Sequence, residues 1–216
     1  MLFGSYDLRT MLLRLPIVFL AITVHECAHG YVAYLLGDRT AKMYGRLTLN
    51  PLHHMDIMGV LCMVLFGFGW AKPVPVNPQY FKNPKGGMSL VGLAGPLSNF
   101  LMAAIFSVLY GLLARFFPTS ESFVVEFFSN LLAVGIMLNI GLGIFNLIPI
   151  PPLDGSKILA YFLPNRWYYK LMEYERYAMP VLILLLFLGI LDRPLTFLQT
   201  HVFAVFWKLI LLVAGI

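Results

Sequence analysis

The sequence is poor in charged residues and in cysteine. Of its 216 residues only 12% are charged, whereas 60% are hydrophobic. Soluble domains carry about a quarter charged residues and disordered chains have few apolar ones, so both classes are excluded. The two cysteines, Cys27 and Cys62, both lie in apolar segments, which excludes a disulfide scaffold. The class that remains is an integral membrane protein, with the lipid bilayer as its expected environment.

Acidic residues are scarcer than basic ones, which gives the chain a net charge of +5. In a soluble protein such an excess would suggest binding to nucleic acid. In a membrane protein, however, Lys and Arg accumulate in the loops on the cytoplasmic side. We therefore interpret the charge as a sign of membrane orientation and expect no nucleic-acid partner.

Five apolar segments are long enough to cross a bilayer, which takes about 20 residues of helix. They are residues 12–36, 88–115, 123–148, 177–191 and 197–216. The fourth is short unless its helix begins further upstream, near Tyr168. A shorter apolar run at 57–70 separates the first two segments, and its composition is compatible with either a sixth span or a re-entrant segment.

A proline-rich segment follows that run, and Pro73 and Pro75 alternate there with Val74 and Val76. In an extended strand both prolines face one edge, where they donate no hydrogen bond, and the valines keep their N–H groups on the other. This pattern is typical of an edge strand with one edge open for pairing. A plain surface loop is the alternative.

The strongest motif in the chain is His25-Glu26-Cys27-Ala28-His29, inside the first apolar segment. On a helix, residues four positions apart share a face, so His25 and His29 can bind one zinc ion. Glu26 is close enough to handle the proton of a metal-bound water. Polar residues inside a membrane helix are costly and usually mark function. The alternative is a pair of histidines in hydrogen bonds between helices, beside a paired glutamate.

Catalytic zinc takes three protein ligands, so a third must come from elsewhere in the chain. Asp154 stands out because it follows a proline-rich turn that ends the third apolar segment. Irregular backbone near the membrane is tolerated only where it is buried in protein or lines a polar cavity. Asp154 could instead cap the next helix, which would begin near Ser156. The other candidates are His53, His54, Asp56, Glu126, Glu173 and His201.

At these residues the chain resembles the site-2 protease family, the intramembrane zinc metalloproteases. The resemblance covers about residues 12–163 and rests on three motifs in the expected order. The motifs are His25-Glu26-Cys27-Ala28-His29, Gly95-Pro96-Leu97-Ser98-Asn99 and Asn146-Leu-Ile-Pro-Ile-Pro-Pro-Leu-Asp154-Gly155. The segment at 69–78 also looks like the loop that follows the motif helix in one branch of the family.

The resemblance implies one zinc ion per chain, bound by His25, His29 and Asp154, with Glu26 as the catalytic base. It also implies that Asn146 helps to hold the substrate backbone or the developing oxyanion. Asn99 is a further candidate for lining the cavity, or else for a hydrogen bond between helices.

The fold implied is an all-α integral membrane protein. A site-2-protease-like core of three transmembrane helices, at about 12–163, is followed by two C-terminal helices at about 168–216. A re-entrant segment and a β-strand or hairpin loop are expected between the first two spans. We expect residues 1–216 to form a single polytopic domain without a PDZ or CBS domain, so that regulation would come from separate proteins.

A shared zinc ion constrains the topology. His25 and His29 lie before the end of the first span, and Asp154 follows the end of the 123–148 segment. These two spans must therefore run in the same direction, so the run at 57–70 should be re-entrant or peripheral. The loops on the Asp154 face hold ten Lys and Arg residues, against four on the other face. This bias places the mouth of the active site on the cytoplasmic side of a bacterial-type cell membrane.

The expected function is zinc-dependent hydrolysis of peptide bonds in or near transmembrane segments of membrane protein substrates. A helical substrate must first unwind, and we expect its exposed backbone to pair with the strand near Val74 and Val76. The alternative is a non-catalytic zinc-binding membrane protein or metal carrier with the same ligands. The sequence lacks the paired half-repeats of a transporter, and a binding site alone has no need of Glu26.

Overall fold

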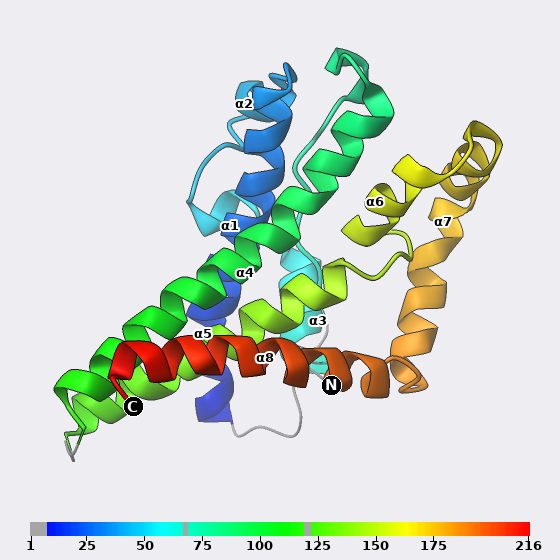
Figure 1. Cartoon of the computed structure of the whole chain (residues 1–216). Helices are drawn as coiled ribbons and strands as arrows, with labels where there is room; N and C mark the ends of the chain where they lie inside the picture. The colour runs from blue at the N-terminus through cyan, green and yellow to red at the C-terminus, as the bar shows by residue number, and fades with distance from the viewer. Residues whose placement is uncertain (1–7, 67–68, 119–121) are drawn as a thin grey trace.

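The computed structural model describes residues 8–66, 69–118 and 122–216, which form helices joined by loops (Figure 1). The longer helices are α1 (Leu8–Leu35), α4 (Pro84–Phe116), α5 (Phe123–Asn146), α7 (Asn165–Phe187) and α8 (Asp192–Ala214). The shorter ones are α2 (Thr40–Met43), α3 (Ile57–Phe66) and α6 (Asp154–Phe162), with 3-10 turns at Pro51–His53 and Pro78–Tyr80. The expected all-α class is confirmed.

The helices α1, α4 and α5 form the centre of the fold. In Figure 1, α1 rises steeply toward the top, α5 runs from the lower left up to the centre of the view, and α4 descends and packs against both. An apolar cluster joins these helices to α8 and includes Ile17, Phe106, Ile136 and Ile210. The parallel course of α1 and α5 is the one that a metal ion shared between α1 and the end of α5 requires.

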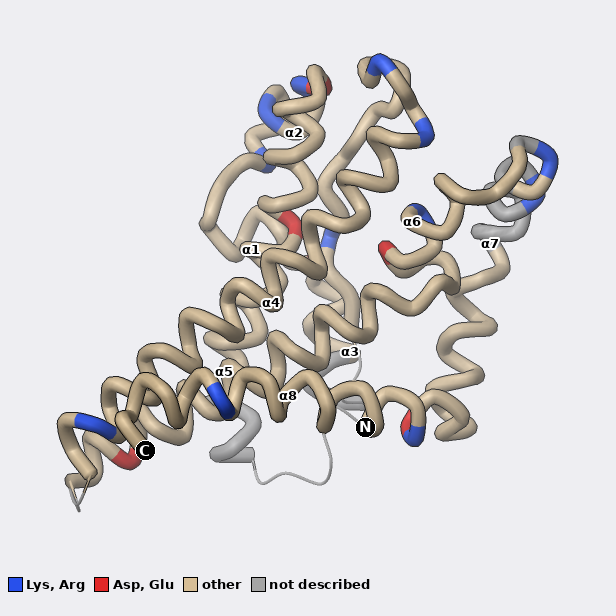
Figure 2. The backbone as a smooth tube through the Cα atoms, in the orientation of Figure 1, with Lys and Arg blue, Asp and Glu red and all other residues tan. Residues whose placement is uncertain are grey.

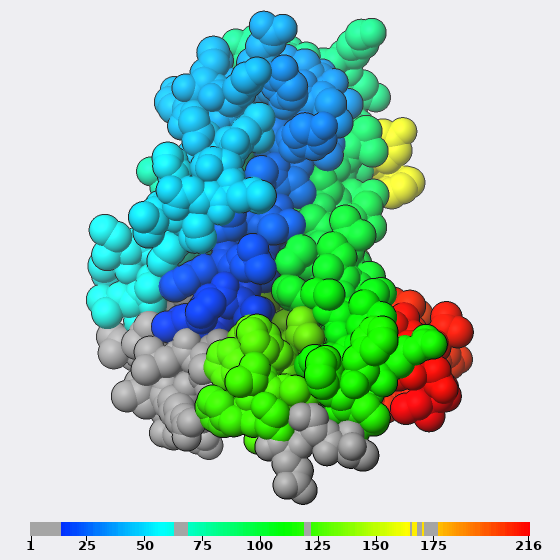
Figure 3. Space-filling model, turned by 90° about the vertical axis from the view of Figure 1, so that its left-hand side faces the viewer, coloured from blue at the N-terminus to red at the C-terminus, as the bar shows by residue number. Residues whose placement is uncertain are grey.

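Four of the described helices are long and apolar enough to cross a membrane, namely α1 from Arg14 onward, α4, α5 and α8. The expected span at 177–191 lies in α7, whose described apolar part, Tyr177–Phe187, is shorter than a span. The helix itself does extend upstream through Tyr168. Only 6% of the most apolar stretch of α8 is buried inside the protein, and Figure 3 shows this helix on the outside of α4. The protein is a multi-pass integral membrane protein.

The segment between α1 and α4 folds back on itself. α3 has 10 residues, about 15 Å of helix, which is half of a hydrocarbon core of about 30 Å. An isolated antiparallel bridge joins Met55 to Ala71, and the Lys72 N–H donates to the His54 carbonyl at 2.9 Å. The two ends of this segment, near residues 55 and 71, therefore lie side by side. Residues 67 and 68 of the apolar run lie outside the described residues.

The strand or hairpin expected in this segment does not form a ladder in the described part of the chain. The bridge between Met55 and Ala71 stands alone, and residues 73–76 adopt no regular structure. Most backbone donors of this segment cannot pair with a neighbouring strand. Pro73 and Pro75 donate nothing, and the Val74 N–H is taken by a side chain of α1.

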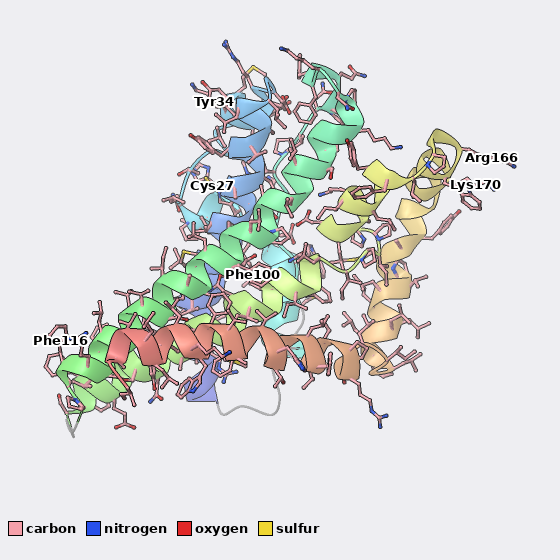
Figure 4. All side chains as sticks on the ribbon, in the orientation of Figure 1. Cys27, Tyr34, Phe100, Phe116, Arg166 and Lys170 are labelled. Carbon is pink, nitrogen blue, oxygen red and sulfur yellow. The ribbon has the colours of Figure 1, made fainter. Side chains whose placement is uncertain are left out.

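Basic residues gather at one end of the helices. Figure 2 shows them beside α2, at the start of α4 and near α6 and α7, with few at the lower end. In Figure 4, Tyr34, Arg166 and Lys170 lie toward this upper end, and Phe116 lies at the opposite one. The two ends of the bundle therefore differ in charge, and the more basic end holds the loops for which the sequence predicts more Lys and Arg.

Candidate metal centre

Two helices deliver three polar side chains to one point. His25 and His29 lie one turn apart on α1, and Asp154 is the first residue of α6. Prolines follow the end of α5 and prevent it from continuing, so the chain turns before α6 begins. A Cβ atom at Gly155 would lie 2.2 Å from the Leu147 carbonyl oxygen, so the turn requires glycine directly after Asp154.

The ligand atoms of these side chains are buried and close together. Oδ2 of Asp154 lies 3.1 Å from Nε2 of His25 and 3.1 Å from Nε2 of His29. The two Nε2 atoms are 3.0 Å apart. The ligands of one tetrahedral zinc ion, each about 2.0–2.1 Å from the metal, are about 3.3 Å apart. The spacing therefore fits a single zinc ion.

On each imidazole, the nitrogen that faces away from Asp154 carries the proton, so no proton lies between the three facing ligand atoms. Nδ1 of His29 lies 2.6 Å from the Val91 carbonyl oxygen, which can only accept, so Nδ1 carries the proton. Nδ1 of His25 lies 2.6 Å from Oδ1 of Asn99 and donates to it. Oδ2 of Asp154 has no hydrogen-bond donor in the described part of the chain. Three acceptors that face one another in this way repel unless a cation lies among them, so the donor set fits a metal ion.

Neighbouring residues hold the ligands in place. Nζ of Lys157 donates to Oδ1 of Asp154 at 2.8 Å and orients the carboxylate. Burial alone would raise the pKa of Asp154, and the positive charge of Lys157 opposes this and favours the ionised carboxylate. The carboxylate is therefore ionised at neutral pH, as metal binding requires.

Helix α4 approaches the imidazoles at a glycine. A Cβ atom at Gly95 would lie 2.5 Å from Cε1 of His25 and 2.5 Å from Nε2 of His29. Such contacts are shorter than side chains tolerate, and both rings are held by partners on their far sides. The closeness of α1 and α4 at the metal centre therefore depends on the missing side chain of Gly95.

Glu26 reaches the proline-rich segment from α1. Its Oε2 atom accepts the Val74 N–H at 2.9 Å. The same segment is fastened a second time, because the Asn77 N–H donates to Oδ2 of Asp38 at 2.6 Å. Asp38 follows α1, is fully buried, and also accepts the Thr40 N–H at 2.8 Å. The segment at 74–77 is thus held against α1 at both ends.

The structure brings some of the predicted site residues together and leaves others apart. His25, His29 and Asp154 form the one cluster of His, Cys, Asp and Glu side chains in the described residues that could hold a metal ion. The capping role considered for Asp154 is wrong, because no side chain caps the start of α6. Asn146 is half-buried at the end of α5, and its Nδ2 atom donates to the Leu142 carbonyl at 3.0 Å.

The other candidate ligands lie outside that cluster. His54 is fully buried, but its Nε2 atom contacts the Thr48 carbonyl oxygen at 2.8 Å. Asp56 accepts the Gly59 N–H at the start of α3. Exposed His201 contacts its own helix. His53 and Glu126 are not in the cluster either, and the side chain of Glu173 lies outside the described residues.

Two neighbours of the site are not predicted from the sequence. Asn139, on α5, accepts a hydrogen bond from Nδ2 of Asn99 at 3.0 Å, and Asp38 anchors the proline-rich segment. The available signal was weak in both cases. Asn139 is one of several polar residues in a mostly apolar helix, and Asp38 is an acid shortly after a span.

Comparisons with known proteins find sequence relatives that are named as zinc metalloproteases. The model of peptidase family M50 matches residues 14–189. YwhC of Bacillus subtilis, named as a zinc metalloprotease, is 39% identical over 183 residues, which cover 85% of this chain and 84% of that protein.

More distant relatives carry similar names. Rip2 of Mycolicibacterium smegmatis is 29% identical over 179 residues, covering 81% of this chain and 66% of Rip2. MJ0392 of Methanocaldococcus jannaschii is 27% identical over 195 residues, covering 88% of this chain and 46% of MJ0392. Both are named as zinc metalloproteases. No solved structure matches the chain.

Proposed function

The chain belongs to peptidase family M50, the site-2 protease family, and we propose that His25, His29 and Asp154 hold its zinc ion. The protein is a zinc-dependent intramembrane protease, and a metal carrier without catalysis is not favoured. One observation carries the proposed ligand set. Two imidazole lone pairs and an unpaired carboxylate oxygen meet at 3.0–3.1 Å with no proton among them.

Glu26 is the proposed catalytic base. A zinc ion held by His25, His29 and Asp154 would polarise the scissile carbonyl and lower the pKa of a water molecule toward ~7. Oε2 of Glu26 is held by the Val74 N–H, which leaves Oε1 to take the proton of the attacking water. The same carboxyl group then gives this proton to the leaving amine. Asn146 is proposed to donate to the substrate carbonyl with the N–H that its own helix does not use.

The proposed substrate is a transmembrane segment of another membrane protein. When such a helix unwinds, its backbone groups need new partners, because the bilayer offers none. The Val76 N–H has no partner in the described part of the chain and is free to donate to an extended substrate. The Val74 N–H, also expected to pair with substrate, is already bonded to Glu26. We therefore assign the first pairing contact to Val76.

The proposed topology is a re-entrant 57–70 segment and an active site that opens to the cytoplasm. The bridge between Met55 and Ala71 supports the re-entrant course, because both ends of the segment lie at one depth. The basic end of the bundle supports the orientation (Figure 2). We further propose one domain, with a catalytic core at 12–163, C-terminal helices at 168–216 and regulation by separate proteins.

The test is a Glu26→Gln variant expressed together with a model substrate that has a single span. We expect cleavage to fall by at least ~100-fold while the zinc content stays at one per chain, because the base is lost and the ligands remain. An Asp154→Ala variant should lose the zinc itself. Full cleavage by Glu26→Gln would contradict its role as base, and unchanged zinc content in Asp154→Ala would contradict the ligand set.

A further inference from the structure

A chain of buried amide groups leads from the metal centre into α5. Nδ2 of Asn99 donates to Oδ1 of Asn139 at 3.0 Å, and Oδ1 of Asn99 lies 2.6 Å from Nδ1 of His25. Nδ2 of Asn139 donates to the Gly135 carbonyl at 2.9 Å. Both asparagine side chains are fully buried. These groups, from His25 to the Gly135 carbonyl, form an amide relay that joins α1, α4 and α5.

The direction of every hydrogen bond in the relay follows from its last member. The Gly135 carbonyl can only accept, so Asn139 must turn its NH2 group toward it and its Oδ1 toward Asn99. Asn99 must then turn its NH2 group to Asn139 and its Oδ1 to His25. Nδ1 of His25 must therefore carry the proton, and Nε2 is left as a lone pair that faces Asp154.

We propose that Asn139 is a positioning residue, which fixes the metal-binding tautomer of His25 through Asn99. The inference rests on the proposed ligation by His25. Without Asn139, the Asn99 amide can turn over and present its NH2 group to Nδ1 of His25. That orientation favours a proton on Nε2, where it occupies the lone pair that a metal ion needs.

The second histidine does not share this dependence. Nδ1 of His29 donates to the backbone carbonyl of Val91, an acceptor that cannot turn over and that no side-chain substitution removes. The relay therefore controls one ligand of the three. Its loss should weaken zinc binding without abolishing it.

The experiment measures zinc affinity of the purified full chain in detergent, by competition between the metal-free protein and a chromophoric chelator for zinc alone. We expect Asn139→Leu to raise the zinc Kd by about 10- to 100-fold, the usual effect of losing a partner of a metal-binding histidine. Asn139→Asp should stay within about 3-fold of the parent chain, because a carboxyl oxygen still accepts from Asn99. Should Asn139→Leu fail to fold, Asn139→Ala tests the same loss.

Two further variants separate positioning from general packing. Ser107→Ala removes a different fully buried hydrogen bond of α4, to the Ala103 carbonyl, and should leave the zinc Kd unchanged. Asn99→Ala combined with Asn139→Leu should bind zinc no more weakly than Asn99→Ala alone, because Asn139 acts only through Asn99.

The proposal is overturned by a zinc Kd in Asn139→Leu equal to that of the parent chain. It is also overturned if Asn139→Asp is as weak as Asn139→Leu, or if the effects of Asn99→Ala and Asn139→Leu add. A His25→Ala variant tells this failure from failure of the ligand set. If His25→Ala binds zinc normally, the ligand set itself is wrong.

Discussion

The proposed metal ligands and the proposed catalytic base are held by different parts of the molecule and in different ways. His25 and His29 are locked by groups of α4 that lie in the buried centre of the bundle. Glu26, on the same helix, is held by one N–H from a proline-rich segment that has no regular structure. The ligands must keep one geometry through every turnover, whereas the base must exchange partners during it. We call the groups of α4 that hold His25 and His29 the helical side, and the proline-rich segment at 74–77 that holds Glu26 the loop side. The helical side suits a rigid geometry, and the loop side suits an exchange of partners.

The largest effect should come from crowding the helical side. Gly95→Ala would place a Cβ atom 2.5 Å from both imidazole rings. Because both rings are locked on their far sides, we expect them to leave the metal-binding geometry and the zinc Kd to rise by at least ~100-fold. Zinc affinity of the metal-free protein measures this.

Gly111→Ala is the matched control on the same helix. Its Cβ atom would lie 2.8 Å from Cβ of Val213 on α8, a comparable clash away from the metal centre. We expect it to disturb the packing of α4 against α8 and to leave the zinc Kd unchanged. Equal losses in Gly95→Ala and Gly111→Ala would show that the rigidity of the ligands is a property of the whole bundle, which contradicts the comparison.

A smaller effect should follow from releasing the anchor of the loop side. Asp38→Ala removes the acceptor of the Asn77 and Thr40 N–H groups, at about 1–3 kcal/mol for each buried group left unpaired. With its far end free, the segment should hold Glu26 less well, and we expect cleavage to fall by about 10-fold at normal zinc content. Cleavage rate and zinc content are measured on the same preparation.

Asp56→Ala is the control for that variant. Asp56 also accepts a backbone N–H, but the donor is Gly59 at the start of α3 and not a residue of the proline-rich segment. We expect it to cleave substrate at close to the normal rate. Loss of zinc from Asp38→Ala would contradict the separation of the two sides, since it would show that the loop supports the ligands as well.

The smallest effects should come from deleting single N–H groups of the loop. Val74→Pro removes the donor to Glu26 and should lower kcat several-fold, by up to about 10-fold, with little change in KM. Val76→Pro removes a donor that is unused in the described part of the chain and should raise KM instead. Steady-state kinetics on a soluble peptide substrate separates the two. If both variants change the same kinetic constant, the Val74 N–H does not serve Glu26 while the Val76 N–H serves the substrate, and the proposed separation of their roles is wrong.

Much of the centre could be predicted because its signals are local. The spacing of His25 and His29 depends only on helix geometry, and the closely spaced prolines before Asp154 prevent a helix from continuing through them. The parallel course of α1 and α5 followed from one shared ion. The membrane class followed from composition, and the all-α class from the lengths of the apolar segments and the family resemblance.

The contacts of the loop and the relay could not be predicted in the same way. A Pro-Val-Pro-Val pattern reports which N–H groups are available, but not that a carboxylate of α1 takes the first of them. Asn99 and Asn139 lie 3.0 Å apart because α4 and α5 pack at one particular rotation, and no period in either helix reveals that rotation. The length of the span expected at 177–191 could not be predicted either, because the sequence does not show where the helix that contains it begins.

The positions of the three proposed ligands along the chain also determine when the metal site is complete during synthesis. His25 and His29 enter the membrane with α1, but Asp154 is translated only after α4 and α5. A nascent chain that stops short of α6 holds two of the three ligands and no complete site. The metal site therefore remains incomplete until the last of its three proposed ligands has been made.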